Sequence, residues 1–265
     1  MLATARQRFL DDYAKIRHAE GRGSADTAYY LELPFRDITG RLQDQWTIRG
    51  ASYAYLESRV LPPIEKRTGR PLRIADLGAG NCWMSYRLSR RGHHLTAVDI
   101  LTDPLDGLQA GSHYQPYTPF PRISAEFDCL PFAHASLDLA IYNASIHYST
   151  DYARTLAEAR RCLRPGGAFF IVDSPVYQKR EHGETMKRER HQQFQKQYGF
   201  ASDTLPSIEY FDRQTLRDLS RKLEISWRIY KPWYGWAWAM RPWKARWYGK
   251  RPPSRFWILE GRFAA

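Results

Sequence analysis

The chain has 265 residues, 43% of them hydrophobic and 14% aromatic, a composition that predicts a globular protein with a large core and excludes a disordered one. The formal net charge is +12, but residues 176–265 carry 19 Lys and Arg against 9 Asp and Glu, whereas residues 1–175 carry 21 against 19. The three cysteines lie far apart, which argues against disulfides and metal sites, and no apolar run reaches the roughly 18 residues of a membrane span, so we expect a cytoplasmic protein.

The first part of the chain is expected to be helical. Apolar side chains recur at helical spacing over residues 2–20, and a second helix is predicted from about residue 42 to residue 61. Pro62 and Pro63 follow directly and are expected to end this helix, because proline disfavours helical backbone in the residue before it. These patterns predict a helical unit ahead of the first strand.

A strand, a glycine-rich turn and a helix follow each other next. Residues 72–83 read Leu-Arg-Ile-Ala-Asp-Leu-Gly-Ala-Gly-Asn-Cys-Trp, and a second apolar strand at 94–99 ends in Asp99. Gly78 and Gly80 let the backbone approach a ligand where a Cβ would collide, and the following helix points unpaired N–H groups at that ligand. An acid at the end of the next strand is placed to accept hydrogen bonds from ribose hydroxyls. The turn therefore predicts a site for an adenosine-type cofactor.

Strands and helices alternate up to residue 174, which predicts a parallel sheet. Asp103 is expected to cap a short helix, and residues 111–121 are expected to form a loop. Further strands are predicted at residues 122–128, 136–143, 168–173, 225–230 and 256–263, and further helices at 152–163, 178–198 and 212–223. The Arg-Pro-Gly-Gly stretch at 164–167 is predicted to be a turn, and residues 232–253 a long loop.

The chemistry of the glycine-rich turn distinguishes between cofactors. A dinucleotide site needs a third glycine where this chain has Trp83, and a phosphate-binding loop needs a Lys and a Ser or Thr that are missing here. The carboxylate of Asp76 would repel a pyrophosphate, but it can accept hydrogen bonds from an ammonium group. S-adenosylmethionine carries an ammonium and a sulfonium and no phosphate, so these residues favour it as the cofactor.

Two motifs carry a resemblance to a known family. Asp76-Leu-Gly-Ala-Gly-Asn-Cys82 resembles the first motif of the class I S-adenosylmethionine-dependent methyltransferases, with Cys82 where that family usually has a third glycine. Asp128-x-Leu-Pro-Phe resembles the next motif, whose acid accepts from the adenine amino group. The chain looks most similar to the small-molecule branch that includes the ubiquinone and menaquinone methyltransferases. The resemblance implies an α/β, Rossmann-like methyltransferase fold: a seven-stranded, mostly parallel sheet with an antiparallel last strand, plus an N-terminal helical cap.

The resemblance also implies how the chain is divided. We expect a helical cap at residues 1–66, an S-adenosylmethionine-binding Rossmann-like core at 67–177, and a helical insertion or lid at 178–211. Residues 212–265 are expected to supply a C-terminal helix and a closing β-hairpin with a basic, Trp-rich loop.

The same resemblance implies the functional residues. Cofactor contacts are expected from the glycine-rich turn and the strand ends, at Asp76, Gly78, Ala79, Gly80, Asn81, Asp99, Ile100, Asp128, Cys129 and Asn143. Contacts to the methionine end or to the acceptor are expected from Tyr29, Tyr30, Trp46, Arg49 and Tyr148. Arg49 is the sharpest of these, because a guanidinium pairs bidentately with a carboxylate. His147 is expected as a general base, since neutral imidazole prevails near pH 7, with Tyr177 as a second catalytic candidate and Asp173 as a weaker one for holding the acceptor.

The implied function is in-line transfer of a methyl group to O, N or C of a small or amphipathic molecule, with no metal. Two alternatives stay open. An RNA methyltransferase could use the basic, aromatic C-terminal region, although Asn143-Ala-Ser-Ile lacks the Asn/Asp-Pro-Pro-Tyr/Phe signature of nucleic-acid N-methylating members. A methyltransferase of a quinone or lipid-linked acceptor could attach to an anionic membrane surface through the Trp-rich stretch at 232–240 and the basic residues beside it.

Overall fold

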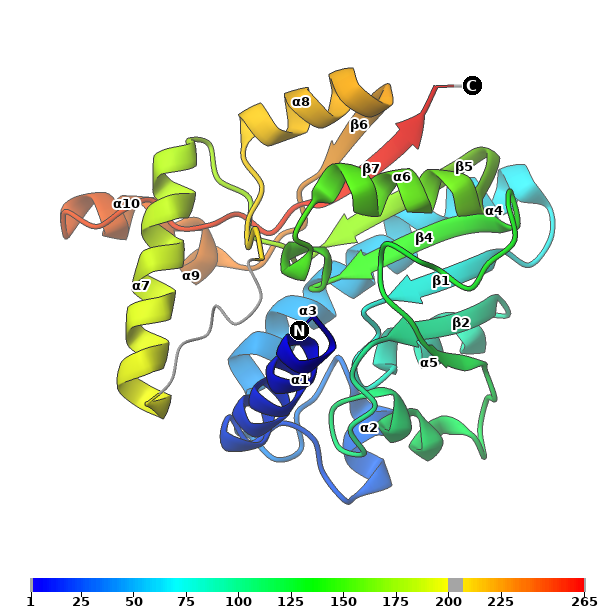
Figure 1. Cartoon of the computed structure of the whole chain (residues 1–265), viewed down its shortest axis with the longest axis horizontal. Coiled ribbons are helices and arrows are strands. Elements are labelled where there is room, and N and C mark those ends of the chain that lie inside the picture. Colours follow the sequence, from blue (N-terminus) through cyan, green and yellow to red (C-terminus); the bar gives the residue numbers. More distant parts are fainter. Residues whose placement is uncertain (1, 200–206, 265) are drawn as a thin grey trace.

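The computed structural model describes residues 2–199 and 207–264, and Figure 1 shows them as one sheet with helices packed around it. The strands are β1 (Arg73–Leu77), β2 (His94–Asp99), β3 (Arg122–Ser124), β4 (Leu137–Asn143), β5 (Leu163–Val172), β6 (Ile225–Tyr230) and β7 (Ile258–Phe263). The α-helices are α1 (Leu2–Ala19), α2 (Thr27–Glu32), α3 (Gln43–Tyr55), α4 (Leu61–Thr68), α5 (Trp83–Arg90), α6 (Tyr152–Cys162), α7 (Arg180–Tyr198), α8 (Arg213–Leu223), α9 (Trp236–Ala239) and α10 (Arg241–Trp247). Shorter turns are the π-helical η1 (Leu56–Val60) and the 3-10 turns η2 (Leu108–Tyr114) and η3 (Ile146–Tyr148).

The sheet has seven strands in the order β3-β2-β1-β4-β5-β7-β6. The first five of these pair in parallel, whereas β7 runs antiparallel to both of its neighbours, β5 and β6. Every residue of β4 is buried, as expected for a central parallel strand with helices on both faces. The predicted α/β fold, with a mostly parallel sheet and an antiparallel last strand, is confirmed.

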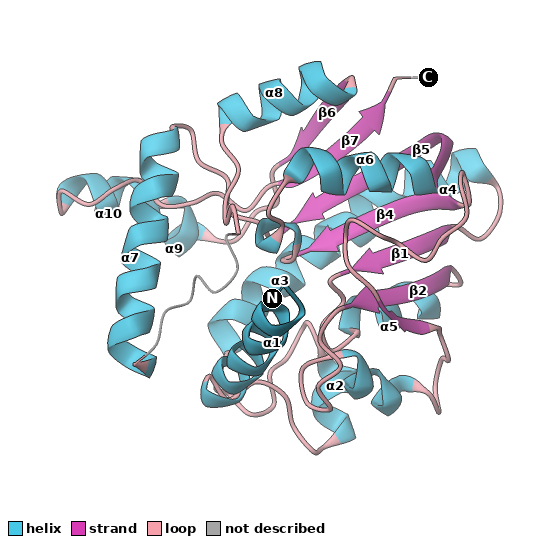
Figure 2. Ribbon diagram, viewed as in Figure 1, coloured by secondary structure: helices cyan, strands magenta, loops and turns pink. Residues whose placement is uncertain are grey.

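Side chains that alternate along the strands build two separate cores, and Figure 2 shows the helices on the two faces of the sheet. On β4, Leu139 and Ile141 pack with α3, α4 and α5 on one face, whereas Ala140 and Tyr142 pack with α6 and α8 on the other. The helices α1, α3, α7 and α9 lie beyond the carboxyl ends of the parallel strands (Figure 1). This is the edge where open α/β sheets hold their ligands.

The predicted helix end at Pro62 and Pro63 is wrong. Both prolines lie in the first turn of α4, where a missing N–H removes no intrahelical hydrogen bond. The chain passes from α3 into α4 through η1, in which the N–H of Leu61 donates to the carbonyl of Leu56, five residues earlier. A wider turn therefore links the two helices at the point where the sequence pattern predicts an end.

The predicted helix at Asp103 is also wrong. The Oδ1 atom of Asp103 accepts hydrogen bonds from the N–H groups of Leu105 and Asp106, both at 2.8 Å, and this closes a turn. At Gly107 the chain packs so tightly that a Cβ would lie 2.6 Å from the carbonyl oxygen of Leu101. The helical structure therefore begins after this glycine, as η2, and extends into the region predicted to be a loop, which starts at residue 111.

Three boundaries in the second half differ from the prediction. β3 ends before the predicted acid, because the chain turns back on itself between Glu126 and Cys129. Leu163 pairs with Leu137 of β4, so β5 begins early and includes the predicted turn at 164–167. The predicted loop at 232–253 contains α9 and α10.

The charged helix predicted at 178–198 is confirmed as α7, and most of its side chains are exposed. Residues 200–206 of the predicted insertion lie outside the described residues. Across residues 2–199 and 207–264, the longest helices are too polar to span a membrane.

Candidate active site

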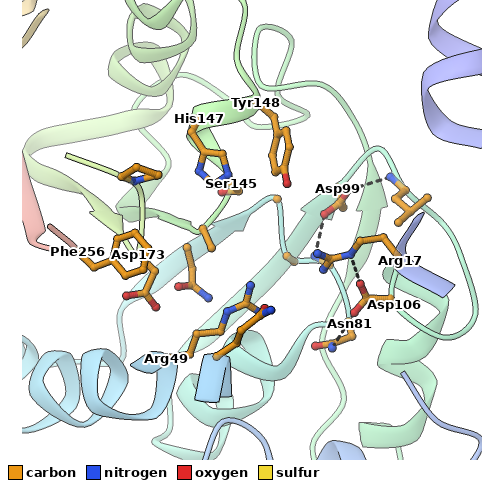
Figure 3. Close-up of a pocket in the computed structure, with 18 of the residues that line it drawn as sticks. Arg17, Arg49, Asn81, Asp99, Asp106, Ser145, His147, Tyr148, Asp173 and Phe256 are labelled. Atoms are coloured by element: carbon orange, nitrogen blue, oxygen red, sulfur yellow. Dashed lines mark hydrogen bonds and ion pairs between the residues drawn. The ribbon is translucent and has the colours of Figure 1, made fainter. Parts of the chain in front are cut away.

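A cavity of about 1340 Å³ opens at the carboxyl edge of the sheet, and Figure 3 shows the side chains around it. Its walls come from α1, α3, the turn after β1, and the segments that follow the other parallel strands. The volume exceeds the roughly 300–1,000 Å³ that is typical of pockets for one small ligand. The cavity therefore has room for a nucleoside-sized cofactor and a second molecule.

The glycine-rich turn between β1 and α5 lies against the segment that follows β4. Gly78 has a φ of +75°, and a Cβ there would stand 2.3 Å from the Cβ of Ser145, so only glycine fits. The N–H of Gly80 donates to Oδ2 of Asp99 at 2.8 Å. This bond fastens the turn to the end of β2, and Ala79 and Asn81 line the cavity from the same turn.

Asp99 ends β2 and lines the cavity beside Ile100. Its Oδ1 accepts a hydrogen bond from the N–H of Leu101 at 2.8 Å, and burial raises the pKa of the carboxyl group. Each carboxylate oxygen keeps a further lone pair, so the group can also accept from two neighbouring hydroxyls of a ligand. The geometry suits the ribose contact that the sequence predicts.

Asp76 lies behind the turn and does not line the cavity. Only 1% of it is exposed, and its Oδ2 accepts from the hydroxyl of Ser85 at 2.7 Å and from the N–H of the same residue at 3.1 Å. Burial raises the pKa of Asp76 to about 7. Oδ1 of Asp76 has no hydrogen-bond partner among the described residues, so the expected contact to an ammonium group stays a prediction.

Of the remaining residues predicted to contact the cofactor, Asp128 and Asn143 line the cavity and Cys129 does not. Asp128 lines the cavity, and its Oδ1 accepts from the hydroxyl of Thr155 at 2.8 Å. Cys129 is exposed and lies outside the cavity, because the tight turn that it forms with Glu126 directs it away. Asn143 at the end of β4 lines the cavity, and its buried Oδ1 accepts no hydrogen bond from the described residues.

Arg49 extends from α3 into the cavity (Figure 3). Its guanidinium lies 4.8 Å from the centre of the Trp46 ring and forms no hydrogen bond or ion pair with the described residues. Burial lowers the pKa of Arg49 to about 10, with the charges of Arg22 and Arg17 acting in the same direction and those of Asp173 and Asp106 acting against it. A half-buried cation that forms no direct ion pair with the described residues marks a place where an anionic group of a ligand is stabilised.

His147 and Tyr148 line the cavity from η3. The Nδ1 atom of His147 lies 3.3 Å from the hydroxyl of Ser174. Burial lowers the pKa of His147 to about 3, and the charges of Arg190, Arg49 and Arg17 act in the same direction. The imidazole is therefore neutral at every physiological pH but takes up a proton reluctantly, which does not favour the predicted general-base role.

Four of the predicted residues lie in the core and not in the cavity: Tyr29, Tyr30, Trp46 and Tyr177. The hydroxyl of Tyr30 donates to the carbonyl of Leu105 at 2.7 Å, and the Trp46 ring packs edge-on against Trp83 at 6.1 Å. The hydroxyl of Tyr177 accepts from Arg251 at 3.1 Å. These aromatic side chains fix the cap and the C-terminal segments to the sheet.

Sequence reasoning missed a polar group on the other side of the cavity. Arg17 of α1 forms an ion pair with Asp106, which also accepts from the side-chain amide of Asn81 at 3.2 Å (Figure 3). The two residues of this ion pair lie 89 positions apart in the chain, so no local sequence pattern predicts it. Tyr234 and Trp238, from the Trp-rich stretch at 232–240, line the cavity as well.

No group of three or more His, Cys, Asp or Glu side chains in residues 2–199 and 207–264 is arranged to hold a metal ion.

A family model described as a methyltransferase domain matches residues 75–171. A malonyl-[acyl-carrier protein] O-methyltransferase of Erwinia pyrifoliae is 33% identical over 101 residues, which span 38% of this chain and 37% of that protein. A methyltransferase of Mycobacterium tuberculosis is 35% identical over 121 residues, or 44% of this chain and 47% of that protein. The chain thus matches less than half the length of these curated relatives.

Solved structures share the fold over much more of the chain. A Burkholderia thailandensis 1,6-didemethyltoxoflavin-N1-methyltransferase with bound S-adenosylhomocysteine has a TM-score of 0.53 and 16% identity, and the match covers 96% of this chain and 90% of that one. An S-adenosylmethionine-dependent methyltransferase of Methanosarcina mazei has a TM-score of 0.52 and 16% identity, with 77% and 98% covered. Residues 75–171, which include the glycine-rich turn and the central strands, are thus similar to a methyltransferase domain, and the chain shares its fold with solved methyltransferases.

Proposed function

We propose that the protein transfers the methyl group of S-adenosylmethionine to a small or amphipathic acceptor. The observation that supports this most strongly is that one cavity holds both parts of such a reaction. The glycine-rich turn and Asp99 lie at one end, and Asp173, Tyr234 and Trp238 lie at the other. Methyl transfer is an in-line displacement at a carbon that is already activated, so the protein acts mainly by alignment and by excluding water.

The charges around the cavity fit the charges of this cofactor. The ribose hydroxyls would face Asp99, and the adenine amino group would face Asp128. The buried Oδ1 of Asn143, which has no donor among the described residues, would accept from the ammonium group. Arg49 would pair with the methionine carboxylate, which supplies the anion that this guanidinium lacks. The ribose hydroxyls, the adenine amino group, the ammonium group and the carboxylate of the cofactor thus each have a partner of the right kind.

The acceptor is a separate question. The relatives named for a malonyl-[acyl-carrier protein] are O-methyltransferases, and the structural neighbour named for didemethyltoxoflavin is an N-methyltransferase. The alignment covers 37% of the length of the malonyl-[acyl-carrier protein] relative, so the acceptor of that relative does not identify the acceptor of this protein. A direct experiment is transfer of labelled methyl groups from S-adenosylmethionine into a small-molecule extract of the source cells. Labelled product is expected, and its complete absence would contradict the proposed function.

The ribose contact gives a specific expectation for cofactor binding. Replacing Asp99 with Ala should weaken the binding of S-adenosylmethionine by about 1–3 kcal/mol, because two ribose hydroxyls lose their acceptor. Asp218→Ala on α8 is the control, since that exposed carboxylate lies on the helix surface away from the cavity. Isothermal titration calorimetry measures both variants, and equal affinities for the two would rule out the ribose contact.

We also propose that the protein works at an anionic membrane surface. Residues 225–259 contain eight Lys or Arg, no Asp or Glu, and seven of the nine tryptophans. Around α9 and α10, Trp233, Trp236, Trp243 and Trp247 are 60–86% exposed. Trp favours the headgroup level of a bilayer, and basic side chains favour anionic lipids. We call residues 232–251 the Trp-rich segment.

The Trp-rich segment has two faces. Tyr234, Trp238 and Arg241 recur at helical spacing and line the cavity, whereas Trp236, Trp243 and Trp247 point outward. Figure 1 shows α10 projecting from the body of the molecule. A membrane bound on the outer face would therefore lie next to the acceptor end of the cavity, which suits a hydrophobic or amphipathic acceptor such as a quinone or a lipid-linked molecule.

Vesicle binding tests the membrane proposal. Lys244→Gln with Arg246→Gln should weaken binding to vesicles of phosphatidylcholine and phosphatidylglycerol by about 2 kcal/mol at low salt, since each basic group near the surface contributes about 1 kcal/mol. Arg217→Gln with Arg221→Gln on α8 is the matched control, because it removes the same charge elsewhere. If both double variants lose the same vesicle affinity, the effect comes from the net charge of the protein and not from the Trp-rich segment. Tight binding to single-stranded RNA with none to vesicles would favour the RNA alternative.

A further inference from the structure

Asp173 occupies an unusual position directly after β5. Its φ is +52°, a left-handed backbone conformation that few residues other than glycine adopt without a local reason. Only 7% of the residue is exposed, yet it lines the acceptor end of the cavity (Figure 3). Backbone strain of this kind is concentrated at functional sites, where the surrounding structure holds the residue in place.

The two oxygens of the Asp173 carboxyl group have different surroundings. Oδ1 accepts a hydrogen bond from the hydroxyl of Ser52 on α3, and that hydroxyl lies 2.8 Å from the hydroxyl of Tyr234. Tyr234 in turn donates to the carbonyl of Phe256 at 2.6 Å. Oδ2 has no hydrogen-bond partner among the described residues. One oxygen is thus fixed by its neighbours, while the other is left to a ligand.

The charged and titratable groups near Asp173 come from three elements. Arg49 on α3 favours the ionised carboxylate, and Tyr234 faces it from the Trp-rich segment. His147 contacts the hydroxyl of Ser174, the next residue in the chain. Burial raises the pKa of Asp173 to about 6, and the hydrogen bond from Ser52 and the charge of Arg49 act against this rise. A proton acceptor is most effective when its pKa lies near the working pH, which Asp173 approaches and His147 does not.

We infer that Asp173 is the general base of the reaction and that the acceptor carries its nucleophile as an O–H or N–H group. The inference rests on the proposed function. As the bond from the acceptor atom to the methyl carbon forms, the carbon–sulfur bond breaks and its electron pair stays on sulfur as a neutral thioether. The acceptor proton passes to Oδ2 of Asp173 and then to solvent. A carboxylate acceptor is disfavoured, because it is already ionised and the negative charge of Asp173 would repel it.

The test uses labelled methyl transfer into the small-molecule extract, followed as a function of pH. For the unmodified protein the rate should rise about tenfold per pH unit up to about pH 6 and then level off, because only the ionised carboxylate accepts a proton. Asp173→Asn should lower the rate by about 10²- to 10⁴-fold and remove this rise. Asparagine tolerates the left-handed backbone, and retained binding of S-adenosylmethionine in calorimetry shows that the variant is folded.

Ser52→Ala supplies a readout that a purely structural role would not change. Losing the Ser52 hydrogen bond raises the pKa of Asp173 further, so the rise in rate should move to higher pH while cofactor binding persists. An Asp173→Asn rate within about tenfold of the unmodified protein, or an unchanged pH profile in it, would overturn the inference. If the unmodified protein binds no S-adenosylmethionine and transfers no label, the proposed function itself fails, which is a distinguishable result.

Discussion

Replacing Arg49 with Met is expected to weaken the binding of S-adenosylmethionine by about 2–5 kcal/mol, because the methionine carboxylate loses its charged partner in a partly buried site. The free protein should be no less stable than before. Burial and the charges of Arg22 and Arg17 disfavour the guanidinium more than Asp173 and Asp106 favour it, so an apolar side chain of similar length removes an unfavourable group. Calorimetry measures the binding, and denaturant unfolding measures the stability.

A second ligand isolates the carboxylate contact. 5′-Methylthioadenosine has the adenosine part of the cofactor but no amino-acid part, so Arg49→Met should bind it as tightly as the unmodified protein does. If both ligands lose affinity equally, Arg49 acts on the shape of the cavity and not on the carboxylate. If neither loses affinity, the guanidinium has no part in cofactor binding.

Replacing Gly78 with Ala is expected to have a comparably large effect. The new Cβ would be placed 2.3 Å from the Cβ of Ser145 in a residue with a φ of +75°. The left-handed backbone costs about 1–2 kcal/mol for a residue with a side chain, and the forced displacement costs about 1–3 kcal/mol more. Because the turn must move away from β4, we also expect methyl transfer to fall by about 100-fold.

Gly166→Ala is the matched control for Gly78→Ala. Gly166 has almost the same φ, +77°, but a Cβ there would meet no atom within 4 Å. This variant should lose only the backbone contribution of about 1–2 kcal/mol to the free energy of unfolding and should keep its methyl transfer rate. Equal behaviour of the two variants would show that the contact with Ser145 does not matter.

The sequence predicts well the features that depend on neighbouring residues. The parallel sheet and the glycine-rich turn follow from local patterns, whereas the seven strands and the antiparallel last strand follow from the family resemblance. The chain direction alone brings the ends of β1, β2 and β4 together. Asp99 therefore lies where the spacing predicts. The helix after Asp103 was misjudged because Gly107 packs against a loop several residues away, and the end predicted at Pro62 was misjudged because prolines also begin helices.

The functional roles of single side chains were harder to predict, because they depend on which way a side chain points and on how deeply it is buried. Asp76 fits a motif, but its carboxyl group turns inward to Ser85. Tyr29 and Tyr30 are aromatic residues of the kind that often line binding sites, but here they are buried and pack in the core. His147 has a favourable pKa in water, and burial with three nearby arginines removes that advantage. Burial has the opposite consequence for Asp173, because it raises the pKa of this carboxyl group toward neutral pH.

The binding of S-adenosylmethionine to the unmodified protein shows whether the cavity at the carboxyl edge of the sheet is a site for this cofactor. Isothermal titration calorimetry should show saturable binding of S-adenosylmethionine and S-adenosylhomocysteine at one site per chain, with dissociation constants between about 1 μM and 1 mM, the range typical of enzyme substrates. Folded protein that gives no binding signal with either ligand at concentrations of about 1 mM would contradict the account.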